Sequence, residues 1–280
     1  MTADIVTSIP ELRRQIGTWR AEGARIGLVP TMGALHEGHL SLVREIGKTT
    51  DKVVVSIFVN PTQFAPHEDF DRYPRNLERD RAKLEGVPAS LVFAPGVGEM
   101  YPQGFATKVL VGGPSEGLET DFRPHFFSGV ATVVSKLLIA AMPDAAIFGE
   151  KDYQQLLVIR RMVRDLGLPI EILGGDILRE KDGLAMSSRN AYLKPNERVI
   201  AARLNVILAE AIELARSGSE LAGIEADAAN GLLRAGFSSV DYVAIRDAET
   251  LKPIARLERP ARILAAAKIG TTRLIDNMAI

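Results

Sequence analysis

The chain has 280 residues, of which 46% are hydrophobic and 25% are charged, and its formal net charge is −1. This composition is that of a globular protein with one large domain or two of ordinary size, and it gives no sign of a nucleic-acid-binding surface. The absence of cysteine excludes disulfides, thiol nucleophiles and cysteine-based metal sites.

Neither an export signal nor a membrane span is indicated. The first 25 residues carry Asp4, Glu11 and Glu22 and do not form a signal peptide. The most apolar helical stretch, 130–142, is shorter than the roughly 20 residues that a membrane-spanning helix needs. We therefore expect a cytoplasmic protein without a membrane or nucleic-acid partner.

Strands and helices alternate through the first part of the chain. In order, the pattern predicts a helix at 8–22, a strand at 25–29, a helix at 38–48, a strand at 53–59, a helix at 75–86 and a strand at 90–95. It continues with an edge strand at 108–112, a helix at 128–141, a strand at 144–149, a helix at 153–167 and a strand at 170–178. Such alternation predicts an α/β fold, with a Rossmann-like, mainly parallel sheet and helices on both faces.

The composition changes after Asn190. The pattern then predicts two helices and three short strands, at 195–216, 219–235, 240–246, 261–268 and 272–278. Gly236 is a typical stop for the second of these helices. Helices followed by strands indicate a smaller α+β domain. We expect domains at 1–178 and 179–280, with the C-terminal domain forming a lid over a ligand site on the first domain.

The segment PTMGALHEGHLSLV, from Pro30 to Val43, directs the functional interpretation. It follows a buried strand, contains a turn at Gly33 and continues into a helix. Such a turn collects free backbone N–H groups and the positive end of the helix at one point, which suits a phosphate. His36 and His39 are three residues apart, so at the start of that helix they point the same way. The sequence therefore predicts a nucleotide triphosphate site with both imidazoles beside it.

Four of the predicted strands end in polar clusters. These clusters span 31–39, 60–63, 150–155 and 179–190. Because the ligands of an open parallel sheet bind beyond the carboxyl ends of its strands, four clusters at one edge predict a single shared site.

The residue types in these clusters fit one chemistry. The cations Lys151 and Arg189 and the small donors Ser187 and Ser188 can surround a polyphosphate together with the histidines. Uncharged amides suit a small hydroxylated acid, and the clusters offer Asn60, Gln63 and Gln155. Neither a G-x-G-x-x-G loop nor a GxxxxGK[ST] loop is present, so a dinucleotide fingerprint and a P-loop are excluded.

Other interpretations of the histidines stay open. His36 and His39 could cap the helix, or they could bind a metal, although their spacing differs from that of H-E-x-x-H. His67 and His125 are expected to be surface or structural residues. Met32 is expected to pack, or else to cover an adenine face.

The other clusters also have plainer interpretations. Lys151 and Asp152 could begin a solvated helix. Residues 187–189 could form an ordinary loop. The shared position of the clusters at strand ends favours a site over these alternatives.

Four longer motifs occur in register: PTMGALHEGH, FVNPTQF, FGEKDYQQL and LAMSSRN. Through them, nearly the whole chain resembles the pantothenate synthetase (pantoate–β-alanine ligase) family. That family belongs with the nucleotidyltransferases that carry a His-x-Gly-His type signature, and its nucleotide site is similar to that of class I aminoacyl-tRNA synthetases. HEGH corresponds to their first signature, and MSSR corresponds to their mobile second one.

The resemblance implies an ATP-dependent ligase. Its reaction would condense (R)-pantoate with β-alanine to pantothenate, AMP and pyrophosphate through a pantoyl adenylate. The resemblance also implies a homodimer, and Mg²⁺ bound largely through ATP and water. The metal has no assigned protein ligand, and Asp80 is a candidate only.

The resemblance further implies roles for individual residues. His39 would be the proton donor, with His36 beside it, and the catalytic set would be completed by Lys151, Ser187 and Arg189. ATP would lie along Met32, Gly33, His36, Gly38, His39, Gly149, Glu150, Lys151, Asp152, Leu178, Met186, Ser187, Ser188 and Arg189. Pantoate would contact Gln155 and Gln63, of which Gln63 would also bind β-alanine, and Asn60 would contribute to the same subsite.

One position departs from the family pattern. The family commonly has Arg-Pro-Gly-His-Phe where this chain has Arg-Pro-His-Phe-Phe at 123–127. Phe126 stands in the place of the family's histidine, so an essential imidazole is not expected there. Arg123 is then the expected polar contributor.

Two other functions are compatible with the residues alone. A nucleotidylyltransferase that moves AMP onto a phosphate acceptor would need a second cationic pocket in place of the three amides. A nucleotide-sensing module would bind ATP without turnover. AMP release with and without β-alanine distinguishes the first function from a ligase. The second function would form no product at all.

Overall fold

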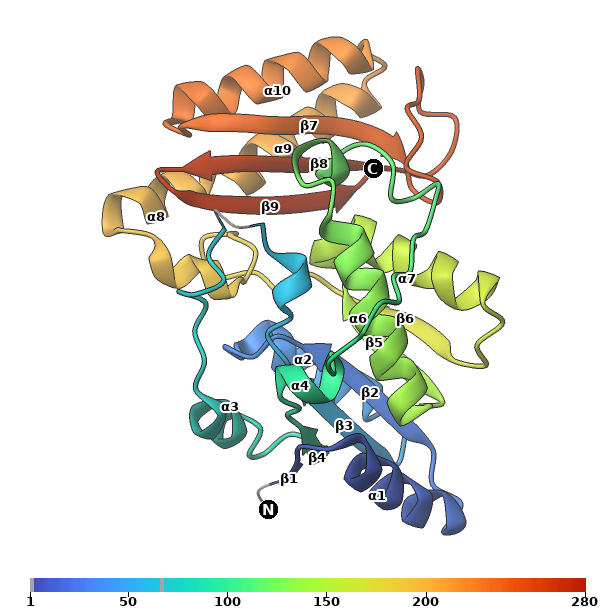
Figure 1. The fold of residues 1–280 in the computed structure, drawn as a ribbon. Helices are drawn as coiled ribbons and strands as arrows, with labels where there is room; N and C mark the ends of the chain where they lie inside the picture. Colours follow the sequence, from blue (N-terminus) through green and yellow to red (C-terminus); the bar gives the residue numbers. More distant parts are fainter. Residues whose placement is uncertain (1–2, 66–67) are drawn as a thin grey trace. The chain divides into compact units, whose positions relative to one another are not determined.

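The computed structural model describes residues 3–65 and 68–280 (Figure 1). Its contacts group the chain into two compact units, and the division passes through helix α7 (Tyr153–Asp165). Unit 1 comprises Met1–Glu150 and Val158–Asp176, and unit 2 comprises Lys151–Leu157 and Ile177–Ile280. Each unit is built on a sheet of its own.

Unit 1 contains a parallel sheet with the strand order β1-β4-β3-β2-β5-β6. Its strands are β1 (Asp4–Val6), β2 (Ile26–Thr31), β3 (Lys52–Ile57), β4 (Ala89–Phe93), β5 (Ala145–Gly149) and β6 (Glu171–Gly175). The chain builds from β2 through β3 to β4 and then crosses to β5 on the other side of β2. An open α/β sheet binds its ligand where the order reverses in this way, so the carboxyl ends of β2 and β5 mark the expected site.

Helices cover both faces of this sheet (Figure 1). On one face, α2 (Glu37–Ile46) and α3 (Leu77–Lys83) pack over the apolar strand residues, in a buried cluster that includes Leu42, Val43 and Val55. Because side chains alternate along a strand, the strand residues next to these point to the other face of the sheet. On that face α1 (Ile9–Ala21) packs against α6 (Phe126–Ala141). The predicted α/β fold with a mainly parallel sheet is confirmed.

Helix α1 shows how local chemistry sets an element's start. Ser8 caps the helix by accepting a hydrogen bond from the backbone N–H of Glu11, whose carboxylate accepts from the N–H of Ser8 in return. Pro10 lies in the first turn, where its missing N–H has no intrahelical partner to lose. The sequence predicts this capping residue and this turn correctly.

The predicted edge strand at 108–112 is wrong. The structure has no strand there; Val109 donates its N–H to Thr132, and Leu110 is 79% exposed. The edge of the sheet is occupied instead by β1, whose Ile5 lies beside Val92 of β4. A short apolar run has strand propensity, but whether it becomes a strand depends on a free sheet edge, which sequence pattern does not show.

Several short elements also go beyond the prediction. They are α4 (Val97–Met100), α5 (Glu119–Phe122), and the 3₁₀ turns η1 (Pro61–Gln63), η2 (Glu150–Asp152) and η3 (Ser188–Tyr192). Elements of three to five residues carry too little periodicity to be read from sequence.

Unit 2 packs helices on an antiparallel sheet of order β7-β8-β9. Its elements are α8 (Pro195–Ala201), α9 (Arg203–Arg216), α10 (Leu221–Ala235), β7 (Ser239–Asp247), β8 (Ala261–Ile269) and β9 (Thr272–Ala279). The single helix predicted at 195–216 is therefore two helices, which meet at Ala202. Gly236 ends α10 in the left-handed region with φ 110°, as predicted.

Over the part of the chain that the structure describes, no helix is both long and apolar enough to cross a bilayer. His67, expected at the surface, lies outside the described residues. His125 directly precedes α6 and is partly buried.

Candidate functional site

The turn between β2 and α2 has a backbone that few residues tolerate. Gly33 and Ala34 both have positive φ, 80° and 50°. Thr31 supports the turn: its hydroxyl accepts a hydrogen bond from the N–H of Gly33 at 3.2 Å and donates to the carbonyl of Ser56 at 2.8 Å. A Cβ at Gly33 would lie 3.0 Å from a carboxylate oxygen of Asp80, so the turn is closed tightly from outside.

Two side chains of α3 hold this turn. Asp80, only 3% exposed, accepts hydrogen bonds from the N–H groups of Ala34 and Leu35, each at 2.8 Å and each through a different oxygen. Lys83 donates to the carbonyl of Leu35. Both carboxylate oxygens of Asp80 thus bind backbone, and its observed role is to shape the turn. Among the described residues no group of three or more His, Asp or Glu side chains could hold a metal ion.

His36 and His39 cap α2 reciprocally. The Nδ1 atom of His36 accepts from the N–H of Gly38, and the Nδ1 atom of His39 accepts from the N–H of His36, both at 3.2 Å. The ring centroids are 4.0 Å apart. A neutral imidazole whose Nδ1 accepts a hydrogen bond carries its proton on Nε2, so each ring has an N–H donor on the side away from the helix backbone. The capping interpretation and the ligand-binding interpretation are therefore compatible.

Asn60 and Gln63 form a buried amide pair at the end of the β3 segment. Asn60 is 1% exposed and Gln63 is 8% exposed. The Nδ2 of Asn60 donates to Oε1 of Gln63 at 2.9 Å, and its Oδ1 accepts from the hydroxyl of Tyr101 at 2.7 Å. These contacts fix the orientation of Asn60, and its expected contribution to the substrate subsite stays a prediction.

Arg123 holds the backbone of Gln63. Its guanidinium donates to the carbonyl of Gln63 at 3.0 Å and makes a two-point ion pair with Glu68, at 2.7 and 2.8 Å. It also lies 3.9 Å from the centroid of the Phe126 ring. Burial raises the pKa of the Glu68 carboxyl, but hydrogen bonding and charge from Arg123 outweigh burial and hold that pKa below its ordinary value. The contacts of Arg123, like those of Asn60, are with protein groups.

Lys151 and Asp152 lie on the 3₁₀ turn η2 at the start of α7. In unit 2 the carbonyl of Lys151 accepts a hydrogen bond from Asn277 of β9 at 2.9 Å, and the Lys151 ammonium lies 3.9 Å from the Asp152 carboxylate. The hydroxyl of Tyr153 donates to the carbonyl of Ala248 at 2.9 Å. The backbone that carries Lys151 is thus fastened to the sheet of unit 2. Gln155 lies one turn further along α7 and is partly buried.

The LAMSSRN motif begins on the second arm of a short hairpin in unit 2 and continues beyond it. Met186 closes the hairpin by donating its N–H to the carbonyl of Leu178 at 2.9 Å. Ser187 then caps η3, where its hydroxyl accepts from the N–H of Arg189 at 3.3 Å. Residues 186–189 are all partly buried.

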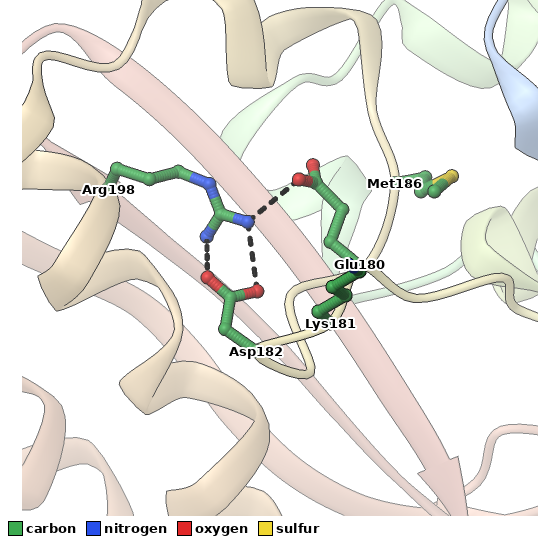
Figure 2. A pocket seen from close by; sticks show the side chains of 5 residues that line it. All are labelled: Glu180, Lys181, Asp182, Met186 and Arg198. Carbon is green, nitrogen blue, oxygen red and sulfur yellow. Dashed lines mark hydrogen bonds and ion pairs between the residues drawn. The ribbon is translucent and has the colours of Figure 1, made fainter.

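Beside this motif, Figure 2 shows Arg198 between Glu180 and Asp182. The guanidinium donates to both carboxylates at 2.9 Å and lines, with Lys181 and Met186, a hollow of about 410 Å³. Burial raises the pKa of Asp182, but the hydrogen bonds that its carboxylate accepts and the charge of Arg198 together lower it by more, so the pKa lies below its ordinary value. Because Asn190 donates to Glu180 at 2.9 Å, these ion pairs also support the end of the motif.

The predicted site residues thus fall into two groups. Unit 1 carries Met32, Gly33, His36, Gly38, His39, Asn60, Gln63, Gly149 and Glu150. Unit 2 carries Lys151, Asp152, Gln155, Leu178, Met186, Ser187, Ser188 and Arg189. Within unit 1, Gly149 ends β5 next to β2, and a Cβ there would be 3.9 Å from Leu42 of α2, so the carboxyl ends of β2 and β5 lie side by side.

Sequence reasoning missed three supporting residues. Lys83 and Tyr101 are in no motif, and Asp80 was expected only as a candidate metal ligand. Each acts on a segment 40 or more positions away in the chain. No local pattern marks such a contact.

Comparison with known proteins identifies the family. A profile described as Pantoate-beta-alanine ligase matches residues 4–279. A pantothenate synthetase of Mesorhizobium japonicum is 56% identical over 275 residues, covering 98% of this chain and 97% of that protein. A pantothenate synthetase of Paramagnetospirillum magneticum is 56% identical over 276 residues, covering 99% and 97%.

Solved structures agree with this result. A crystal structure of pantothenate synthetase from Thermus thermophilus has a TM-score of 0.91 at 48% identity, covering 98% of both chains. A crystal structure of pantoate-beta-alanine ligase from Francisella tularensis, complexed with beta-gamma ATP and beta-alanine, has a TM-score of 0.83 at 32% identity, covering 99% of this chain and 97% of that one. The match spans both units and includes the HEGH and MSSR motifs, so the chain is an enzyme that belongs to the pantoate–β-alanine ligase family.

Proposed function

We propose that this enzyme condenses (R)-pantoate with β-alanine to give pantothenate, AMP and pyrophosphate, through an enzyme-bound pantoyl adenylate. Family membership supports the overall reaction. The complex of the Francisella tularensis ligase with beta-gamma ATP and beta-alanine supports ATP and β-alanine as substrates. The observation that carries the proposal in this chain is the β2–α2 turn, with two imidazole N–H donors at a helix N-terminus.

A carboxylate is a poor electrophile because attack on it must add charge to an anion. In the proposed first step a pantoate carboxylate oxygen attacks the α-phosphorus of ATP, and the bond to the pyrophosphate oxygen breaks. The amine of β-alanine then attacks the acyl carbon, and AMP leaves with the electrons of the acyl–oxygen bond. The first step requires alignment and charge stabilisation more than covalent help from the protein.

The described residues match these needs. His36 and His39 direct Nε2–H hydrogen-bond donors away from the α2 backbone, which suits phosphate oxygens. The role of His39 as proton donor rests on the family resemblance alone. Lys151, Ser187 and Arg189 of unit 2 would supply the charge and hydroxyl that meet the leaving pyrophosphate. Gln63 and Gln155 would bind pantoate, and the rest of the predicted ATP-binding set would line the nucleotide. This proposal requires unit 2 to act as a lid that closes over the β2–α2 turn and excludes water from the adenylate.

Magnesium enters the proposal only as an ion carried by ATP. The described residues form no metal cluster, and both oxygens of Asp80 already accept backbone hydrogen bonds. Phosphate oxygens and water are ligands that Mg²⁺ prefers, and when bound the ion would neutralise phosphate charge. No step above depends on a protein ligand to the ion.

The test is the dependence of each half-reaction on its substrates. We expect exchange of labelled pyrophosphate into ATP when pantoate is present without β-alanine, and stoichiometric AMP and pantothenate when β-alanine is added. Exchange that needs no pantoate, or AMP transfer to a phosphate acceptor, would favour a nucleotidylyltransferase. ATP binding with no exchange under any condition would favour a sensing module.

Two further properties stay predictions. A homodimer is expected, and light scattering of the purified protein measures it directly. A cytoplasmic location is expected, and fractionation of cells that express the protein tests it.

A further inference from the structure

The polarity of the Asn60 side chain is set by backbone groups that cannot exchange roles. Its Oδ1 lies 3.3 Å from the N–H of Thr62, which can only donate. Its Nδ2 lies 3.3 Å from the carbonyl of Gly129, which can only accept. Turning the amide over would set an oxygen against the Gly129 carbonyl and an NH₂ against the Thr62 N–H, so a single orientation satisfies both.

Two hydroxyl groups strengthen this orientation. Tyr101 donates to Oδ1 of Asn60 at 2.7 Å, the shortest hydrogen bond of the Asn60 side chain. The Thr62 hydroxyl donates to the same oxygen at 3.0 Å. Burial raises the pKa of Tyr101 above its ordinary value, although hydrogen bonds with Thr62 and Asn60 act in the opposite direction. The phenol therefore keeps its proton and acts as a donor across the neutral range.

The orientation of the Asn60 amide fixes the orientation of the Gln63 amide. Because Nδ2 of Asn60 donates to Oε1 of Gln63 at 2.9 Å, the oxygen of the Gln63 amide is turned toward Asn60. Its Nε2 is on the other side of the same planar group and is turned away. Tyr101, Asn60 and Gln63 thus form one directed chain of hydrogen bonds, which we call the amide relay.

The backbone of Gln63 is fixed as firmly as its side chain. Arg123 holds the Gln63 carbonyl at 3.0 Å. Helix α6 approaches the η1 turn so closely that a Cβ on Gly129 would lie 2.3 Å from the Thr62 carbonyl oxygen. The side chain of Gln63 is therefore kept within reach of Asn60. Turning the Gln63 amide over would break the hydrogen bond between them.

We propose that Tyr101 and Asn60 are positioning residues that make Gln63 a hydrogen-bond donor toward substrate, so that this subsite selects oxygen acceptors. The inference rests on the proposed function and adds the polarity of its acid-binding subsite. Gln63 would hold pantoate through a carboxylate or hydroxyl oxygen. It would meet β-alanine through the carboxylate, and the ammonium group, which needs an acceptor, would bind elsewhere.

The substitution Asn60→Asp tests this polarity with almost no change in shape. An ionised carboxylate still accepts from Tyr101 and Thr62, but it has no proton for Oε1 of Gln63. The Gln63 amide is then expected to turn over and present its oxygen to the substrate oxygen. We expect KM for pantoate at pH 8 to rise about 10- to 100-fold, as for a lost hydrogen bond to a charged group, with KM for ATP within about twofold of wild type.

The decisive readout is the pH dependence of the ratio of the variant's KM for pantoate to that of the wild type. Because position 60 is buried, the pKa of the introduced carboxyl is expected to lie above its ordinary value, so lower pH protonates it. The protonated group can then donate to Gln63 and restore the wild-type orientation. The ratio is expected to fall toward one as pH is lowered from 8 to 5. Taking the ratio cancels titrations that both proteins share, including those of the histidines. A general loosening of structure would not recover in this way.

Two other variants accompany this one. Tyr101→Phe removes one donor and leaves Thr62, so a smaller rise of about 3- to 10-fold in KM for pantoate is expected, with KM for ATP unchanged. Asn76→Asp makes the same charge change at an exposed cap of α3, where either side chain accepts from the N–H of Arg79, and it should behave as wild type. If Asn60→Asp does not fold, Gln63→Glu replaces it, since its ionised oxygen would face the substrate and its pH recovery should be the same.

An Asn60→Asp variant whose KM ratio is raised equally at all pH values, or whose KM for pantoate is unchanged, overturns the relay. An equal rise in KM for ATP overturns it as well, because it indicates a collapsed site. These results are distinct from a failure of the proposed function, in which the wild-type protein itself would show no pantoate-dependent pyrophosphate exchange.

Discussion

The buried polar groups of unit 1 that hold the proposed site and the unit 2 residues proposed to bind the phosphates are held in different ways. In unit 1, Asn60, Gln63 and Asp80 are at most 8% exposed, and each is hydrogen-bonded to backbone groups or to a neighbouring polar side chain. In unit 2, Lys151 and the 186–189 segment are partly exposed and lie on or beside short 3₁₀ turns.

This difference matches two kinds of recognition. A small uncharged donor discriminates among ligands only if its direction is fixed, which requires a buried and fully bonded setting. A cation acts on phosphate over a longer range and tolerates more freedom. The comparison therefore predicts that variants of the unit 2 cations change the rate of adenylate formation, whereas variants of the buried polar groups Asn60, Gln63 and Asp80 in unit 1 change the affinity for pantoate or ATP.

The largest effect is expected for Lys151→Ala. Loss of a cation that meets charge on the leaving pyrophosphate should slow adenylate formation by about 10²- to 10³-fold while leaving the fold intact. A rapid-quench measurement of AMP or pyrophosphate formation in a single turnover reports it. Lys252→Ala, at an exposed position of unit 2, is the control. Near-normal adenylate formation in Lys151→Ala would remove that residue from the catalytic set.

Asp80→Ala should act next most strongly, through the β2–α2 turn. The N–H groups of Ala34 and Leu35 would lose their acceptors, at a cost of about 1–3 kcal/mol for each buried group. We expect a lower melting temperature and a higher KM for ATP, measured by calorimetry and steady-state kinetics. Glu78→Ala, on an exposed part of the same helix, should change neither. A loss of activity in Asp80→Ala that excess Mg²⁺ restores would instead indicate a metal ligand.

Gly129→Ala should weaken pantoate binding by pushing the η1 turn. The added Cβ would lie 2.3 Å from the Thr62 carbonyl oxygen and 3.1 Å from the N of Gln63, so η1 has to move. KM for pantoate should rise more than KM for ATP. Gly17→Ala in α1 is the matched control, since nothing lies within 4 Å of its new Cβ, and it should stabilise the protein by about 0.5–1 kcal/mol. An equal fold-increase in KM for the two substrates in Gly129→Ala would contradict the proposed place of η1.

The smallest effect concerns Glu68 at acid pH. Its pKa is lower in the folded protein than in the unfolded chain, so its ion pair stabilises the fold fully above the ordinary glutamate pKa. That contribution is lost as pH falls through the lowered pKa. In Glu68→Gln the corresponding part of the pH dependence of stability should be absent below the ordinary glutamate pKa, as measured by denaturant unfolding at several pH values. Parallel stability curves for the two proteins at acid pH would contradict this prediction.

Much of the fold could be predicted from the sequence, because it depends on local signals. The Ser8 cap, the buried β3 run and the Gly236 stop are all set by residues within a few positions. The failures arose where an outcome depends on distant partners. Residues 108–112 have the composition of a strand, but β1 holds the sheet edge beside β4. The break between α8 and α9 at Ala202 carries no proline or glycine to announce it.

The predicted anion site also depends on local signals, since a strand, a glycine turn and two histidines spaced three apart bring backbone N–H groups and imidazoles to one helix start. It stays a prediction. What only the tertiary structure decided is which protein groups the polar side chains contact. Asn60 and Arg123 have the polarity of ligand-binding groups, yet their partners are Gln63, Tyr101 and Glu68. Hydrogen-bond direction is a property of a pair of groups in space, and these pairs are made by segments up to 60 positions apart.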